Sequence, residues 1–394
     1  MLIKNARLVD ANGEMYGDIC IENGTISSIG KELFGEGPVI DANGRTVLPA
    51  FIDLHCHFRT PGYEYKEDIM SGSRSAAAGG YTFVNCMANT NPVCSNGALA
   101  NEIMAKAKEI NICDVNQVVS LTKNMDGQTL DHLETLPDNI RIISDDGCGV
   151  QSAAVMVKAM QIAARKGLLI MSHAEDKELS PTDYRLAENV ETVRNLYIAS
   201  TTRARLHMSH VSTSEALKAV ALAKQAKINV TCEVTPHHLF FYDNDYKVNP
   251  PIRSKEDVDC IIDLIKKNIV DAIATDHAPH TDADKLNGAA GMVGLETAFG
   301  ACYTKLCIEN DLPLSTLSRM MSANPAKLLG LNKGLLRPGY DGDIVIVDTS
   351  KTYVVHKEQF HGKSQNTLFD GIELTGKVEL TAKSGEITFV TERK

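Results

Sequence analysis

The chain has 394 residues, of which 43% are hydrophobic and 23% are charged, proportions typical of a soluble globular protein. Its net charge of −10 argues against a nucleic acid or an anionic membrane surface as partner, so an anionic substrate would need a local binding site. The ten cysteines are scattered singly, and neither a signal-peptide core nor an 18-residue apolar run occurs. We therefore expect reduced thiols and a cytoplasmic protein.

The two ends of the chain share a pattern of short strands separated by tight turns. Asn12-Gly13, Asn23-Gly24 and Asn43-Gly44 are strong hairpin signals, which predict a small antiparallel sheet. Alternating apolar residues return from position 341 onward. We therefore expect residues 1–50 and 335–394 to form one small β-sandwich domain built from both termini.

The middle of the chain, residues 51–334, alternates short apolar runs with helical stretches, which is typical of repeated βα units and a parallel sheet. Ser152 and Gly167 are placed to begin and end one such helix, and a second is expected over 212–226. The segment after the third strand, 126–138, has little helical periodicity. The pattern predicts an α/β fold with a (β/α)8 TIM-like barrel. The eight candidate strands are 47–57, 81–88, 115–122, 140–146, 168–176, 205–212, 228–238 and 271–280.

The first of these strands carries the sequence DLHCHFR. Strict alternation would place Asp53, His55, His57 and Arg59 on one face and Ile52, Leu54, Cys56 and Phe58 on the other. An HxH pair alone is weak because chance nearly supplies one in a chain with 12 histidines. However, nine of the 12 lie at or just beyond the carboxyl end of a candidate strand, where a barrel forms its active site.

Imidazole and carboxylate groups at these strand ends indicate a metal centre. Such ligands suit Zn²⁺, with Mn²⁺, Fe²⁺ or Co²⁺ as alternatives. Four histidines and two aspartates exceed the needs of one catalytic ion, so two ions sharing a bridge are favoured. A histidine near a strand end is more often structural, and this interpretation is kept for His207, His237, His238 and His277. Glu175 and Asp176 are assigned to loop or supporting roles and Cys56 to packing, whereas the role of Cys148 stays open, with structure favoured.

The sequence contains the motifs DLHCHFRTPG, MANTNPV, SDDGCGVQ, HAED, HMSHVST, VTPHHL, NPPIR and ATDHAPH. These motifs resemble those of dihydroorotases, which are cyclic amidohydrolases of the amidohydrolase superfamily. The resemblance implies reversible cyclisation of N-carbamoyl-L-aspartate to dihydroorotate and water, the third step of pyrimidine synthesis. It also implies two Zn²⁺ ions bridged by Asp146 and a hydroxide. His55, His57 and Asp276 would hold one ion and His173 and His210 the other, with Asp276 as the proton shuttle.

The resemblance also implies a set of substrate-binding residues. These are His57, Arg59, Asn89, Asn249, His280, Ala290 and Gly291. Arg59 also has an independent physical argument, because a guanidinium beside a metal site suits two-point binding of a carboxylate. The chain departs from the family pattern in RTPG for REPG, MANT for MPNT, a short segment after HAED, and a changed loop over 281–292. The glycine- and alanine-rich loop is a candidate lid.

Two other functions stay open. One is an allantoinase or hydantoinase, against which Arg59 and Asn89 argue because a neutral hydantoin ring offers no carboxylate. The other is a non-catalytic dihydroorotase-like subunit of aspartate transcarbamoylase, which should have lost metal ligands, whereas every ligand position here is filled. We expect a small-molecule substrate, a homodimer and an association with aspartate transcarbamoylase, with neither nucleic acid nor membrane as partner.

Overall fold

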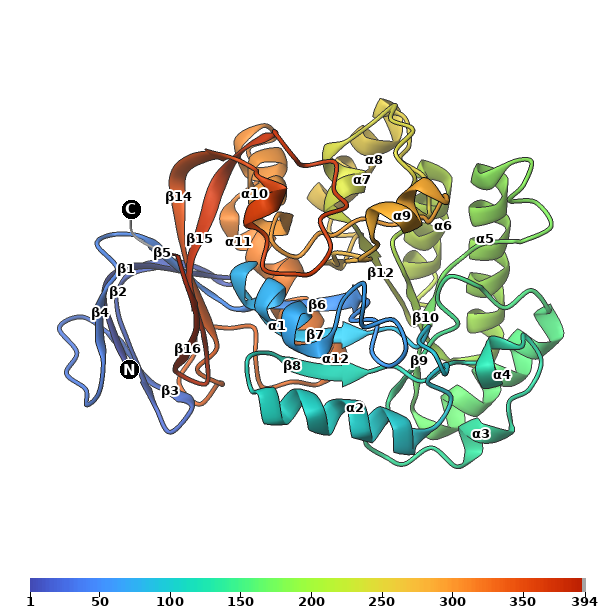
Figure 1. Ribbon diagram of the computed structural model, residues 1–394, viewed down its shortest axis with the longest axis horizontal. Coiled ribbons are helices and arrows are strands. Elements are labelled where there is room, and N and C mark those ends of the chain that lie inside the picture. The colour runs from blue at the N-terminus through green and yellow to red at the C-terminus, as the bar shows by residue number, and fades with distance from the viewer. Residues whose placement is uncertain (392–394) are drawn as a thin grey trace.

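The computed structural model describes residues 1–391 and has a mixed α/β architecture (Figure 1). Strands from both termini form one eight-stranded sheet, drawn at the left of Figure 1, in the order β16-β15-β14-β5-β1-β2-β3 with β4 paired to β1. The β5–β14 pairing therefore joins the two ends of the chain, as the sequence predicts. The strands are β1 (Leu2–Asp10), β2 (Gly13–Glu22), β3 (Thr25–Gly30), β4 (Val39–Asp41), β5 (Thr46–Pro49), β14 (Ile344–Val354), β15 (Glu373–Lys383) and β16 (Glu386–Val390).

The expectation of a purely antiparallel sheet is wrong in one respect. Strands β4 and β5 both pair with β1 in parallel, because the chain crosses back after β3 and runs alongside β1 in the same direction. One hydrophobic cluster, which includes Ile3, Ile19, Ile344 and Leu380, draws on both ends of the chain. Burying these side chains together stabilises the joint sheet.

Eight parallel strands occupy the middle of the chain, and each overlaps one of the predicted segments. They form a three-stranded sheet and a five-stranded sheet. Isolated parallel bridges pair Val119 with Ile143 and Cys56 with His277, so that each of the eight strands has a parallel neighbour on both sides. They are β6 (Phe51–Cys56), β7 (Tyr81–Cys86), β8 (Asp114–Gln117), β9 (Ile142–Ile143), β10 (Leu169–Ser172), β11 (Arg205–Met208), β12 (Val230–Val234) and β13 (Ala272–Ile273).

Helices connect these strands and pack around them (Figure 1). Ser152 caps α4 by accepting a hydrogen bond from the Val155 amide, and Gly167 ends it with a left-handed φ of 69°, as predicted. Between β8 and β9, where periodicity is weak, the longest helix has four residues. The helices are α1 (Ile69–Ala78), α2 (Gly97–Ile110), α3 (Asp131–Glu134), α4 (Ala153–Lys166), α5 (Tyr184–Thr202), α6 (Ser214–Gln225), α7 (Pro236–Phe240), α8 (Lys255–Lys266), α9 (Asp282–Leu286), α10 (Ala298–Cys302), α11 (Leu314–Ser318) and α12 (Asn324–Leu329).

Two expectations about the first strand are corrected. Segment 47–57 is not one strand, because β5 ends at Pro49 and β6 begins at Phe51, in a different sheet. Strict alternation also fails: Leu54 packs in a separate cluster with Met87 and Met171, whereas Cys56 packs in the main core. The pairing of β6 with β7 is irregular between Asp53 and Cys56, which breaks the two-residue period.

Within residues 1–391, no helix combines the length and the apolar character needed to cross a membrane.

Candidate active site

Six buried side chains from the carboxyl ends of five strands converge on one point, because β6 supplies both His55 and His57. His55 Nε2 lies 3.1 Å from Asp146 Oδ1, His57 Nε2 lies 3.2 Å from Asp276 Oδ1, and His173 Nδ1 lies 2.9 Å from His210 Nε2. The sets His55-His57-Asp276 and His55-Asp146-His210 each gather their ligand atoms within 4.8 Å. The structure thus brings together all six predicted metal ligands.

Asp146 occupies the centre of this group. Its Oδ1 lies 3.6 Å from both His173 Nδ1 and His210 Nε2, while its Oδ2 lies 3.5 Å from His57 Nε2. Asp146 Oδ1 and His55 Nε2 are both buried without a hydrogen-bond partner. Buried polar atoms are normally satisfied, and a divalent cation between them would satisfy both. The donor set therefore fits a metal ion.

Charge compensation inside the cluster is strong. Burial alone would raise the pKa of the Asp276 carboxyl, but a hydrogen bond from His57 and the charges of His55 and His210 hold it well below its usual range. Burial likewise disfavours the charged form of His55, yet Asp146, Glu233 and Asp276 raise its pKa well above the ordinary value. A bound cation can replace the protons that the imidazoles would otherwise carry.

The outward-facing nitrogens of three ligand rings are held by other side chains. His55 Nδ1 lies 3.1 Å from Glu233 Oε1, His57 Nδ1 lies 2.9 Å from Asn89 Oδ1, and His173 Nε2 lies 3.0 Å from Glu175 Oε2. Each contact fixes the tautomer that leaves the other ring nitrogen free as a ligand.

Glu233 also contacts His207, whose Nε2 lies 3.0 Å from Glu233 Oε2. The predicted supporting roles of His207 and Glu175 therefore agree with the geometry. His238 is held by Thr235 Oγ1 at 2.7 Å and by the Pro250 carbonyl at 3.0 Å, which is a structural arrangement.

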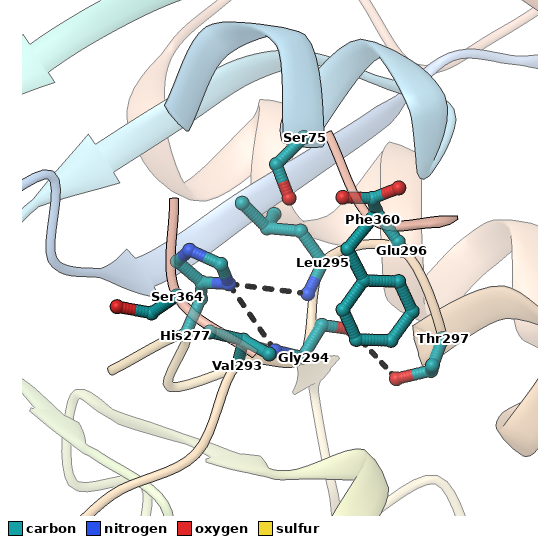
Figure 2. A pocket seen from close by; sticks show the side chains of 9 residues that line it. All are labelled: Ser75, His277, Val293, Gly294, Leu295, Glu296, Thr297, Phe360 and Ser364. Atoms are coloured by element: carbon teal, nitrogen blue, oxygen red, sulfur yellow. Dashed lines mark hydrogen bonds between the residues drawn. The ribbon is translucent and has the colours of Figure 1, made fainter. Parts of the chain in front are cut away.

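His277 follows Asp276 in the chain and lines the small pocket shown in Figure 2. Its Nδ1 accepts a hydrogen bond from the Gly294 amide at 3.2 Å, and its Nε2 lies 3.6 Å from a carboxylate oxygen of buried Glu67. The His277 carbonyl accepts from the His57 amide at 2.9 Å. None of the six ligand candidates lines this pocket, so we assign it to packing behind the metal cluster.

A second, basic group lies beside the cluster. Arg59 Nη2 is 3.3 Å from His280 Nε2, and Lys66 Nζ is 3.3 Å from His280 Nδ1. Burial and the charges of Arg59 and Lys66 lower the pKa of His280 to about 3, so the ring is neutral at physiological pH. The backbone of Gly291 packs against His280, where a Cβ would come within 3.2 Å of the ring. Ala290 precedes it in the same loop.

The two predicted asparagines lie nearer to the metal ligands. Asn89 Nδ2 donates to Asp146 Oδ2 at 3.3 Å, and Asn249 Nδ2 donates to Glu175 Oε2 at 3.1 Å. Asn249 also accepts a hydrogen bond from Tyr184 at the start of α5. In this arrangement both asparagines orient ligand-bearing groups, and their role in holding a substrate stays a prediction.

Sequence reasoning missed Lys66, Glu233 and Glu67. A glutamate inside the largely buried strand β12 was a usable signal for Glu233, because a buried carboxylate needs partners. Lys66 lies in a turn after β6, where periodicity carries no information.

The comparisons with known proteins agree with this geometry. The family model described as "Amidohydrolase family" matches residues 46–388. A dihydroorotase from Clostridium botulinum is 48% identical over 99% of both chains, and one from Thermoanaerobacter is 39% identical over 100% of this chain and 98% of its own. This chain belongs to the amidohydrolase family, among the dihydroorotases. It is therefore a hydrolase of a metal-dependent family that acts on a small molecule.

Solved structures share the fold. The L-hydantoinase (dihydropyrimidinase) from Arthrobacter aurescens matches with a TM-score of 0.89 at 25% identity over 98% of this chain and 95% of its own. The dihydropyrimidinase from Brevibacillus agri matches with a TM-score of 0.86 at 22% identity over 98% and 94%. The alignment with the Thermoanaerobacter relative spans 424 positions, whereas that with the Clostridium botulinum relative spans 394. This chain thus shares its shorter length with the Clostridium botulinum relative.

Proposed function

We propose that this chain catalyses the reversible cyclisation of N-carbamoyl-L-aspartate to (S)-dihydroorotate and water in pyrimidine biosynthesis. The observation that carries the proposal is the buried histidine–aspartate cluster with Arg59 beside it. The cluster suits hydrolysis of an amide, and the guanidinium suits a substrate that keeps a carboxylate. The names of the similar chains agree with both features.

We infer that the eight parallel strands form a (β/α)8 barrel and that the sandwich domain comprises residues 1–50 and 335–394, with the barrel over 51–334. The two-sided pairing of every parallel strand supports the first inference. The hydrophobic cluster that draws on both ends supports the second. In such a barrel the carboxyl ends of the strands meet at one face, which is where the six candidate ligands come from.

For the metal centre we propose two Zn²⁺ ions, one held by His55, His57 and Asp276 and the other by His173 and His210. The central position of Asp146 supports its assignment as the bridge. When bound, the ions would polarise the amide carbonyl and lower the pKa of a water molecule.

The residues of the chain would divide the remaining work. Asp276 takes a proton from the attacking water and returns it to the ring nitrogen that leaves, so it acts as base and then as acid. In the reverse direction the carbamoyl nitrogen bonds to the side-chain carboxyl carbon and one oxygen leaves as water. Because two carboxylates become one, cyclisation consumes a proton. Arg59 and Asn89, with Asn249 and His280, hold the carboxylate that does not react, and Ala290 and Gly291 contact the ring.

The Asp276→Asn variant tests this assignment. Asparagine has nearly the same shape and tolerates the left-handed φ of 46° at this position, so the variant should fold. We expect kcat to fall at least 100-fold with dihydroorotate, while elemental analysis still finds metal. Near-normal turnover by a metal-loaded variant would refute the role of Asp276.

The alternative substrates are separated by one assay. Purified, zinc-loaded protein is offered dihydroorotate, carbamoyl-aspartate, allantoin and hydantoin. The basic group at Arg59 favours the first two, although hydantoinases share the fold. Activity confined to allantoin or hydantoin would refute the proposal, and absence of any turnover would favour a non-catalytic subunit of aspartate transcarbamoylase.

We also propose that the protein is a homodimer. The outer face of α5 supports this proposal, because Leu186, Val190, Val193 and Tyr197 are all exposed along it. None of these four positions carries a charge, so two copies could pair there without like-charge repulsion. Sedimentation of the Val193→Lys variant should show monomers where the unchanged protein shows dimers. An association with aspartate transcarbamoylase is a separate proposal, tested by co-sedimentation.

A further inference from the structure

Lys66 is held beside the proposed active site by two successive turns. The Tyr63 amide donates to the Arg59 carbonyl at 3.0 Å, and the Lys66 amide donates to the Tyr63 carbonyl at 2.9 Å, so the chain folds back on itself after β6. The Lys66 side chain is only 13% exposed. Its ammonium lies 5.5 Å from the ring centres of both Tyr63 and Tyr65, which shield the charge from solvent.

The contacts of Lys66 provide too few hydrogen-bond acceptors for its ammonium group and the neighbouring guanidinium. Lys66 and Arg59 approach opposite nitrogens of the same imidazole, His280, at 3.3 Å each. Both cations are donors only, whereas a neutral imidazole has one acceptor nitrogen. His280 can therefore satisfy one of them and must present an N–H group to the other.

The nearby carboxylates do not neutralise the charges of both Lys66 and Arg59. Asp284, at the start of α9, lies 3.4 Å from Lys66 and also accepts hydrogen bonds from Thr281. Among residues 1–391, no carboxylate lies within ion-pair distance of Arg59, whose Nε donates to the Pro279 carbonyl at 3.2 Å. Two confined cations thus share one protein carboxylate, in a protein whose net charge is −10. An anion beside His280 that contacts both Lys66 and Arg59 would complete the charge balance.

We propose that Lys66 is a second cation for the non-reacting carboxylate of the substrate and binds it together with Arg59. This inference rests on the proposed function. Asp284 holds Lys66 in position in the free enzyme and competes with the substrate for its charge. The chemical class recognised by the pair is a small ring or chain with a carboxylate on the carbon bonded to its substituted urea nitrogen, and a ring without that carboxylate gains nothing from Lys66.

The test compares Lys66→Met with the unchanged enzyme. We expect KM for dihydroorotate to rise about 10-fold to 100-fold, the range for loss of a charged hydrogen bond, with kcat within about threefold. Dihydrouracil has the same ring without the carboxylate, and its inhibition constant as a competitor should not change. Lys66→Arg should recover part of the loss. Lys106→Met, which removes an exposed lysine paired with Glu102, is the matched control and should change neither constant.

A second variant separates binding from a purely structural role. Asp284→Asn removes the competing charge and keeps a side chain that can cap α9, so KM for dihydroorotate should fall about two- to fivefold. A KM for Lys66→Met within twofold of the unchanged value would overturn the inference. An equal rise in KM and in the dihydrouracil constant, or a raised KM in Asp284→Asn, would also overturn it, since Lys66 would then only shape the pocket. If the unchanged enzyme turns over neither dihydroorotate nor carbamoyl-aspartate, the proposed function and this inference fall together.

Discussion

Glu233 connects two histidines through its two carboxylate oxygens. It is fully buried in β12, with His55 on one oxygen and His207 on the other. Burial opposes ionisation, but the charge and hydrogen bond of His207 and the contact with His55 lower the pKa of Glu233 to about 2. Glu233 is therefore a carboxylate at neutral pH, and it fixes the orientation of the His55 ring in the proposed metal cluster.

We predict that Glu233→Gln weakens metal binding about 10-fold to 100-fold. Glutamine is neutral and has one acceptor oxygen, so it cannot accept hydrogen bonds from both imidazoles as the carboxylate does. Competition with a zinc chelator measures the affinity, and excess zinc should restore part of the activity. Glu109→Gln, on the exposed face of α2, is the control. Unchanged affinity in the Glu233 variant would show that His55 needs no support from this side.

The residue types at strand ends predicted the six ligands, because any fold that gathers these ends gathers those side chains. The same reasoning could not find Lys66. Its approach to His280 depends on two turns and on the Ser364 side chain, which donates to the Lys66 carbonyl at 2.7 Å from nearly 300 residues away. Contacts of this range leave no periodic trace in the sequence.

Helix α5 buries charged and polar side chains and exposes several apolar ones. Its buried residues include Glu188, Glu191 and Asn195, whereas Val190, Val193 and Tyr197 are exposed. The buried polar groups hold loops that carry metal ligands. Glu191 accepts from the Glu175 amide at 3.0 Å, and Asn195 donates to Ser172 Oγ at 2.9 Å, on either side of His173. The helix thus acts as a polar support for the site.

Glu188 supports the loop after His210 in the same way. It accepts hydrogen bonds from the Ser212 amide at 2.8 Å and from Arg253 Nη2 at 2.8 Å. Burial would raise the pKa of Glu188, but the charge of Arg253 and the hydrogen bonds from Ser212 lower it. Its stabilising contribution is therefore complete above the unfolded pKa of about 4.3 and is lost as pH falls through the lower folded value.

We predict that Glu188→Gln lowers the free energy of unfolding by about 3 kcal/mol at pH 7, because Arg253 is left buried and unpaired. The difference between the two proteins should shrink below about pH 4, where the unchanged carboxylate begins to lose its advantage. Urea denaturation at pH 7 and pH 3.5 measures both values. Glu178→Gln, at an exposed position, should behave like the unchanged protein at both pH values. A difference that does not depend on pH would contradict the ionic explanation.

At the scale of the whole molecule, local patterns predicted the eight parallel strands and the joining of the two termini. They did not predict the parallel placement of β5 beside β1, since direction depends on how a connection crosses the sheet. Nor could they predict the irregular pairing near Asp53. This buried carboxylate accepts hydrogen bonds from the Thr275 amide at 2.9 Å and the His55 amide at 3.2 Å, across the junction of β6 with the segment after β13. Packing across the molecule overrides the two-residue period there.

The proposed metal centre links distant parts of the chain, because its ligands run from His55 to Asp276. A cation that binds only the folded protein stabilises it by about 4 kcal/mol when present at 1,000 times its dissociation constant. For a chain of this length, this corresponds to a melting temperature about 5 °C higher. We predict such a difference between zinc-loaded and chelator-treated protein in differential scanning calorimetry.

The shift should grow as pH rises and continue to grow above pH 8, because neutral imidazoles bind the metal and the raised pKa of His55 keeps that ring protonated in the metal-free protein. The double variant Asp146→Ala, His210→Ala removes the proposed bridge and one ligand of the second ion, so its melting temperature should respond much less to zinc. A zinc response of equal size in both proteins would place the ion elsewhere. Identical melting temperatures for loaded and chelated unchanged protein would mean that the cluster holds its shape through its own carboxylate–imidazole contacts alone.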